Sequence, residues 1–144
     1  MLKWLIVFHV LGASIWVGGH LLLTFRYLPE SLRKKDLRIL LDYESKYEPI
    51  GFPALIIQLI TGIWMAVSVY NVNLFGWSNP VEKAVTLKLV LLLTIIALAA
   101  NVRFRILPKL TLENVNVLAM HIITVTVISV LMVYLGISVR FGGI

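Results

Sequence analysis

Cysteine is absent from the 144-residue sequence, and charged residues make up only 14% of it. Without cysteine the chain has no disulfide, no thiolate metal site and no cysteine nucleophile. A soluble domain carries about one quarter charged residues, so the composition does not fit one. The sequence also has no nucleophile–base–acid constellation and no phosphate-binding glycine loop. Soluble hydrolase chemistry and nucleic-acid binding are therefore not expected.

Apolar residues are abundant instead, at 60% of the chain with a mean hydropathy of +0.94. They form four runs that are each long enough to cross a hydrocarbon core about 30 Å thick. Such runs must be helices, because a lone segment in lipid has to satisfy its own backbone hydrogen bonds. We expect an all-α fold, an integral membrane four-helix bundle that forms one transmembrane domain over residues 1–144. The expected spans are residues 2–28, 50–70, 81–107 and 115–139.

The segment between the first two spans, residues 29–48, mixes charges with apolar side chains. The apolar ones recur at roughly helical spacing and are Leu32, Ile39, Leu40 and Tyr43. This pattern predicts a short amphipathic helix at the membrane interface, with a solvated loop as the alternative. Pro49 and Pro53 stand at the start of the second span, where proline is tolerated.

Basic residues between the spans predict the orientation. Those at the first and third connections are Arg26, Arg33, Lys34, Lys35, Arg38, Lys46, Arg103, Arg105 and Lys109. Those on the opposite side are Lys3, Lys83 and Arg140. By the positive-inside rule the first and third connections face the cytoplasm. We expect a multi-pass protein of the cell's inner (plasma) membrane with both termini outside the cytoplasm, and the lipid bilayer as its first partner.

Four ionisable residues fall inside the spans: His9, His20, Lys88 and His121. Each costs about 2.5–3.5 kcal/mol on insertion scales, so each calls for a reason. His9 and His20 are eleven positions apart, which places them on one helix face. Their axial separation is about 16 Å, too far to share one metal or one haem. The histidines therefore predict two sites at different depths.

The inner level holds His20 and His121, which reach the same depth on antiparallel helices. This match predicts a b-type haem with these two histidines as axial ligands to the iron, since helix bundles build cofactor sites from facing side chains. Further cofactor-binding candidates are two glycines that make room for the ring or for another helix backbone, a tryptophan that could pack against a ring at either level, and arginines that could pair with the propionates. They are Gly12, Gly19, Trp16, Arg26, Arg103 and Arg105.

The outer level holds His9 together with Lys88. Met65 and Met132 fall near the same depth and are weaker metal-ligand candidates. A second haem at His9 is one interpretation, with its other axial position filled by Lys88 or a methionine, or left open. Ordinary alternatives remain at each position: interhelical hydrogen bonds for the histidines, snorkelling for Lys88, lipid contact for the methionines and topology for the arginines.

Two segments resemble a known family. The stretch from His9 through Gly12 and Trp16 to Gly19 resembles the first helix of small membrane proteins related to copper resistance protein D (CopD). The third span, with Leu87-Lys88 followed by Asn101-Val-Arg-Phe-Arg-Ile-Leu-Pro108, resembles that family's Lys-Leu helix, which ends in an Asn-Arg-Phe-Arg-x-x-Pro segment. Both segments are also similar to HemJ-type haem-b membrane proteins. The second similarity implies His9 as a haem ligand and Lys88 as its functional partner. The first implies copper transfer across the membrane, with His9 and methionines as soft ligands.

The sequence thus predicts a haem-b protein of electron transfer or redox chemistry, with one or two haems. Whether it is a haem-dependent oxidoreductase is left open, and the catalytic residues are not assigned. Copper transport or resistance of the CopD type is the alternative, and a structural or accessory subunit is the second. The partners expected with a haem are a redox protein or a quinone-like small molecule. Small-residue faces such as Ala97 and Ala100 leave a homo-oligomer open.

Overall fold

The structure, a computed structural model, describes residues 2–144 and is helical without strands over that range. Four of its helical stretches are long and apolar enough to cross a membrane: Leu2–Lys34, Arg38–Ser68, Pro80–Lys109 and Val115–Arg140. The predicted all-α, four-span architecture is therefore confirmed, and the observed stretches contain most of each predicted span.

The first and third spans are built alike. The first consists of α1 (Leu2–Leu22), a π-helical turn over Leu23–Tyr27 and the short α2 (Leu28–Lys34). The third consists of α4 (Pro80–Asn101), a π-helical turn over Val102–Ile106 and a 3₁₀ turn over Leu107–Lys109. The second and fourth spans are single helices, α3 (Arg38–Ser68) and α5 (Val115–Arg140).

Helix ends follow from local sequence. Asn79 caps α4, because its side-chain oxygen accepts a hydrogen bond from the Glu82 backbone N–H at 2.9 Å. Pro80 takes the first helical position, where its missing N–H costs nothing. At the other end of the bundle, Lys35 adopts a left-handed conformation with φ of 52° and ends α2. These caps place the turns that separate one span from the next.

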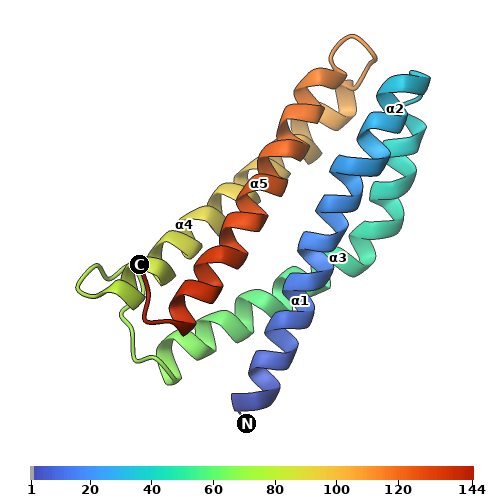
Figure 1. The fold of residues 1–144 in the computed structure, drawn as a ribbon. Helices are drawn as coiled ribbons and strands as arrows, with labels where there is room; N and C mark the ends of the chain where they lie inside the picture. The colour runs from blue at the N-terminus through green and yellow to red at the C-terminus, as the bar shows by residue number, and fades with distance from the viewer. Residues whose placement is uncertain (1) are drawn as a thin grey trace.

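The spans pack as two pairs. Helix α1 lies along α3, α4 lies along α5, and contacts between α1 and α5 join the two pairs. Figure 1 shows the α2–α3 turn and the α4–α5 connection at one end of the molecule. The α3–α4 connection and both termini lie at the opposite end, where the Ile144 N–H donates to the Pro80 carbonyl at 3.3 Å. This alternation is the one that the predicted topology requires.

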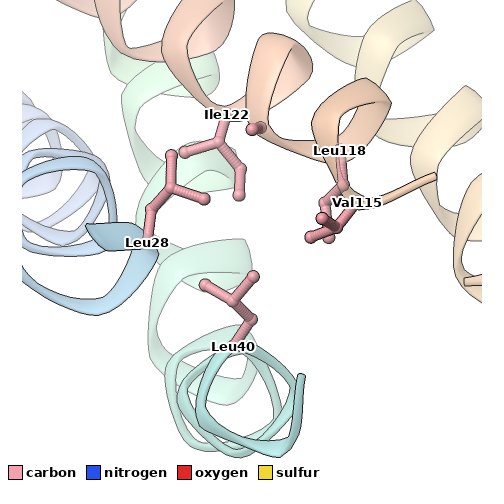
Figure 2. Packing of buried hydrophobic residues seen from close by; sticks show 6 residues of the cluster. Leu28, Leu40, Val115, Leu118 and Ile122 are labelled. Carbon is pink, nitrogen blue, oxygen red and sulfur yellow. The ribbon is translucent and has the colours of Figure 1, made fainter. Parts of the chain in front are cut away.

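A cluster of buried apolar side chains closes the end that carries the α2–α3 turn. Figure 2 shows Leu28 from α2, Leu40 from α3 and three α5 residues, Val115, Leu118 and Ile122, pointing toward one another. Each is at most 8% exposed, although the cluster lies at the end of the bundle. The cluster fixes α2 and the start of α3 against α5.

The predicted separate interfacial helix over residues 29–48 is not observed in that form. Residues 38–48 are the first turns of α3, which continues through Pro49 and Pro53. The physical reason is packing against α1: the Tyr43 hydroxyl donates to the Gly19 carbonyl at 2.7 Å, and the Tyr47 hydroxyl donates to carbonyls of the same helix. These bonds hold the segment against the bundle.

Candidate functional site

A cavity of about 660 Å³ lies between the four spans and is lined by residues of each. Its volume is in the range of small-molecule sites, about 300–1,000 Å³. On α1 it extends from Ile6 to Leu21, a length of about 22 Å at 1.5 Å per residue. Most lining residues are apolar. The polar and sulfur-bearing ones are His9, Ser14, Trp16, Gln58, Met65, Tyr70, Lys88, Ser129, Met132 and Arg140.

His9 is held in one orientation by α3. Its Nδ1 lies 2.9 Å from the Thr61 hydroxyl oxygen, and that hydroxyl donates its hydrogen to the Ile57 carbonyl at 2.6 Å. Thr61 can therefore only accept from His9, so the ring hydrogen is on Nδ1. The Nε2 lone pair is then available for a ligand. Gly62 makes the approach possible, since a Cβ there would lie 3.0 Å from His9 Cε1.

Lys88 lines the same cavity from α4. Its Nζ lies against Gly136 of α5, where an added Cβ would stand 3.1 Å from it. Among residues 2–144 we find no hydrogen bond or ion pair made by this ammonium group. The Lys88 ammonium group is therefore available to a ligand in the cavity.

The residues predicted for the outer level therefore come together. His9, Lys88, Met65 and Met132 all line the one cavity, from four different helices. Trp16 lines it as well, and its indole Nε1 donates to the Ser129 hydroxyl at 3.1 Å. No three His, Cys, Asp or Glu side chains gather as a metal site within the described part of the chain. A metal in the cavity would have to combine histidine with thioether ligands.

His20 lies outside this cavity. Its ring packs between Trp16, with ring centroids 4.7 Å apart, and the edge of Tyr47 at 6.1 Å. Its Nδ1 is the one buried polar side-chain atom without a hydrogen-bond partner in residues 2–144. The ring is thus enclosed by aromatic groups of α1 and α3.

His121 has different neighbours. Its Nδ1 donates to the Val117 carbonyl at 2.8 Å, so its Nε2 accepts from the Asn101 amide at 3.0 Å. Both ring nitrogens are engaged, and the second bond joins α5 to α4. His121 therefore makes an interhelical hydrogen bond, which was the alternative to haem ligation. Its ring nitrogens bond to Val117 and Asn101 and not to any group beside His20.

The remaining candidates also lie away from the cavity. Arg103 pairs with Glu48 at 3.5 Å, both side chains being more than half exposed. Arg26 and Arg105 are exposed near the same end. Gly12 and Gly19 serve helix packing: a Cβ at Gly12 would stand 2.9 Å from the Ala54 carbonyl oxygen, and one at Gly19 would collide with the Tyr47 ring.

Sequence reasoning missed three residues that line the cavity, Gly62, Gly136 and Arg140, and also Thr61, which orients His9. Thr61 and the two glycines carry no charge and do not stand out in an apolar span. Arg140 was assigned to topology alone. Only the structure shows that each glycine faces one of the two ionisable residues of the outer level.

Comparison with known proteins adds the family. A family profile described as copper resistance protein D matches residues 43–140, more than half of the chain. The chain belongs to the copper resistance protein D family. The match includes Met65, Lys88 and Met132, whereas His9 and the rest of α1 precede it. No curated protein and no solved structure matches the chain. Neither this family match nor the neighbours of His20 and His121 supports the haem b expected from the sequence.

Proposed function

We propose that this CopD-family protein binds copper(I) in its membrane cavity as cargo for transfer across the bilayer, with His9 Nε2 as the nitrogen ligand. The observation that carries the proposal is the Thr61 hydrogen bond, which places the ring hydrogen on Nδ1. Metal-ligating histidines characteristically donate their other ring N–H to a neighbouring acceptor in this way. The family match supports copper as the metal.

Met65 of α3 and Met132 of α5 are the proposed thioether ligands. Both line the cavity with His9. Soft thioether ligands select copper(I) over harder cations, and imidazole is compatible with it.

The route proposed for copper follows the length of the cavity. Its α1 lining extends to Leu21, and its other end reaches Tyr70 and Leu74 beside the α3–α4 connection. The distribution of basic residues supports an orientation with that connection outside the cytoplasm, by the positive-inside rule. We therefore propose that copper enters or leaves the cavity on the outer face of the inner membrane.

Copper stoichiometry tests the proposal. The full chain in detergent would be loaded with copper(I), desalted and measured for copper per chain, alongside His9→Ala and Met65→Leu/Met132→Leu. His121→Ala is the matched control, because His121 lies outside the cavity. We expect about one copper per chain in wild type and in the control, as one histidine-centred site implies, and loss of it in the other two. Equal copper in wild type and His9→Ala would overturn the proposal.

The same preparation tests the haem interpretation. Its absorption spectrum should show no Soret band if copper is the cargo. A Soret band with sharp reduced α and β bands that disappears in His9→Ala would instead assign the cavity to haem b and reject copper binding at His9.

A further inference from the structure

The cavity is built from two corresponding halves of the chain. Every α4 residue that lines it stands 79 positions after an α1 residue that also lines it. The corresponding pairs are Ile6 and Val85, His9 and Lys88, Val10 and Leu89, and Ala13 and Leu92. His9 and Lys88 are therefore equivalent positions on two parallel helices.

Helices α3 and α5 correspond in the same way. Each of the seven α5 lining residues, from Ser129 to Arg140, stands 74 positions after an α3 lining residue between Leu55 and Ala66. Gly62 and Gly136 are one such pair, and they face His9 and Lys88 respectively. Each half of the chain thus has a glycine that makes room for an ionisable side chain.

The ends of the first and third spans confirm the offset of 79. Phe25-Arg-Tyr-Leu-Pro29 corresponds to Phe104-Arg-Ile-Leu-Pro108, and both stretches follow the same pattern of Phe-Arg-x-Leu-Pro. The two π-helical turns, Leu23–Tyr27 and Val102–Ile106, are also 79 positions apart. The α1–α3 and α4–α5 pairs are therefore two parallel repeats with the cavity between them. Transporters made of repeats place their substrate sites at this interface.

The two halves of the cavity differ in charge. Lys88 takes the place equivalent to His9, and Arg140 takes the place equivalent to Ala66, so both cations of the cavity belong to the α4–α5 half. Arg140 follows Gly136 by four positions, which puts it one turn along the helix face that Lys88 Nζ contacts. No Asp or Glu lines the cavity in the part of the chain that the structure describes.

We propose that the cavity also binds an elongated amphiphile with one anionic head group, held between Lys88 and Arg140. An anion there offsets the cost of the Lys88 cation inside the span, where opposite charges attract strongly. Arg140, which is exposed at the end of α5, adds a second cation at the outer end of the cavity. The apolar part of the ligand then runs inward past Trp16 toward Leu21, along the largely apolar wall of the cavity. This inference does not rest on copper binding, because it uses the cations of the α4–α5 half.

Quenching of Trp16 fluorescence provides the test. Trp16 lines the cavity, and the other three tryptophans are exposed, so they are replaced as Trp4→Phe, Trp64→Phe and Trp77→Phe. The detergent-solubilised full chain is titrated with 12-bromododecanoate and with its neutral analogue 12-bromododecanol. We expect saturable quenching at lower concentration with the acid, because only the acid has an anionic head group.

Variants locate the head group. Lys88→Met and Arg140→Gln should each weaken binding of the acid at least about tenfold, the loss expected for a charge-assisted hydrogen bond. Binding of the alcohol should not change. Lys88→Arg keeps the charge and should retain binding, which separates charge loss from misfolding. Arg105→Gln at the opposite end is the matched control. Equal affinity for acid and alcohol, or an unchanged Lys88→Met, would overturn the inference.

Competition identifies the natural head group. Dodecanoate and dodecyl phosphate are each added to the complex with the bromo acid. Displacement by both assigns a general anion site, and displacement by one alone assigns either carboxylates or phospholipid phosphates. Displacement by neither would show that the quenching reports adsorption to the detergent micelle, and would reject the site.

Discussion

The hydroxyl oxygen of Thr61 accepts a hydrogen bond from His9 Nδ1 over 2.9 Å. Because the same hydroxyl donates to the Ile57 carbonyl, it has no hydrogen of its own left to offer the ring. One threonine on α3 thereby fixes both the tautomer and the orientation of a histidine on α1. The contact joins the packing of two helices to the chemistry of the cavity, since a shift of α3 would release the ring.

Thr61→Val should weaken copper(I) binding by about 10–100-fold, the usual effect of removing a hydrogen-bond partner behind a metal-ligating histidine. Valine has the shape of threonine but cannot accept from Nδ1, so the ring can rotate and change tautomer. Competition with a copper(I) chelator of known affinity measures the change. Thr94→Val is the control, because the exposed Thr94 hydroxyl bonds only to its own helix at Val90. Equal affinities in wild type and Thr61→Val would show that His9 needs no such support.

Gly12→Ala should lower the free energy of unfolding by about 1–3 kcal/mol, the typical cost of overpacking. The new Cβ would stand 2.9 Å from the Ala54 carbonyl oxygen, and backbone at that distance cannot move aside cheaply. Gly18→Ala is a matched control on the same helix, since a Cβ there meets nothing within 4 Å. Its higher helix propensity should leave stability equal or slightly increased. Thermal unfolding in detergent, followed by circular dichroism, compares the two, and equal Tm values would contradict the close α1–α3 approach.

Most of the fold was predictable because the membrane imposes it. Runs of apolar residues longer than the hydrocarbon core leave helices as the solution, so span number followed from hydropathy alone. The separate interfacial helix failed as a prediction at residues 38–48. Tyr43 and Tyr47 bond to backbone carbonyls of α1, and such tertiary contacts between distant segments leave no signature in local periodicity.

The site was predictable in part. Depth arithmetic brought His9 to the level of Lys88, and both line one cavity. The same arithmetic matched His20 with His121, but depth does not specify which way a side chain faces around its helix. Asn101 on α4 satisfies His121, and Trp16 with Tyr47 surrounds His20. Rotational setting depends on which helices are neighbours, and that information is spread over the whole packing.

The Asn101–His121 contact should stabilise the α4–α5 pair without taking part in the cavity. In a double-mutant cycle of Asn101→Leu and His121→Phe, we expect a coupling energy of about 0.6–1.7 kcal/mol, as measured for hydrogen bonds between membrane helices. Unfolding in a mixed-micelle denaturant series gives the four stabilities. Copper per chain should stay equal in all four proteins, because neither residue lines the cavity. Loss of copper in His121→Phe would return His121 to the metal site.

Cysteine labelling should show the α3–α4 connection outside the cytoplasm, at the end of the bundle where both termini lie. The natural chain has no cysteine, so each introduced thiol is the only one present. Asn73→Cys lies in the α3–α4 connection, while Lys35→Cys follows α2 and Lys109→Cys precedes α5, both among the basic residues. In intact cells a membrane-impermeant maleimide should label Asn73→Cys only, and permeabilisation should expose the other two. The reverse pattern would contradict the expected orientation, in which the basic end of the bundle stays in the cytoplasm by the positive-inside rule. It would also move the proposed outer opening of the cavity, beside Tyr70 and Leu74, to the cytoplasmic face.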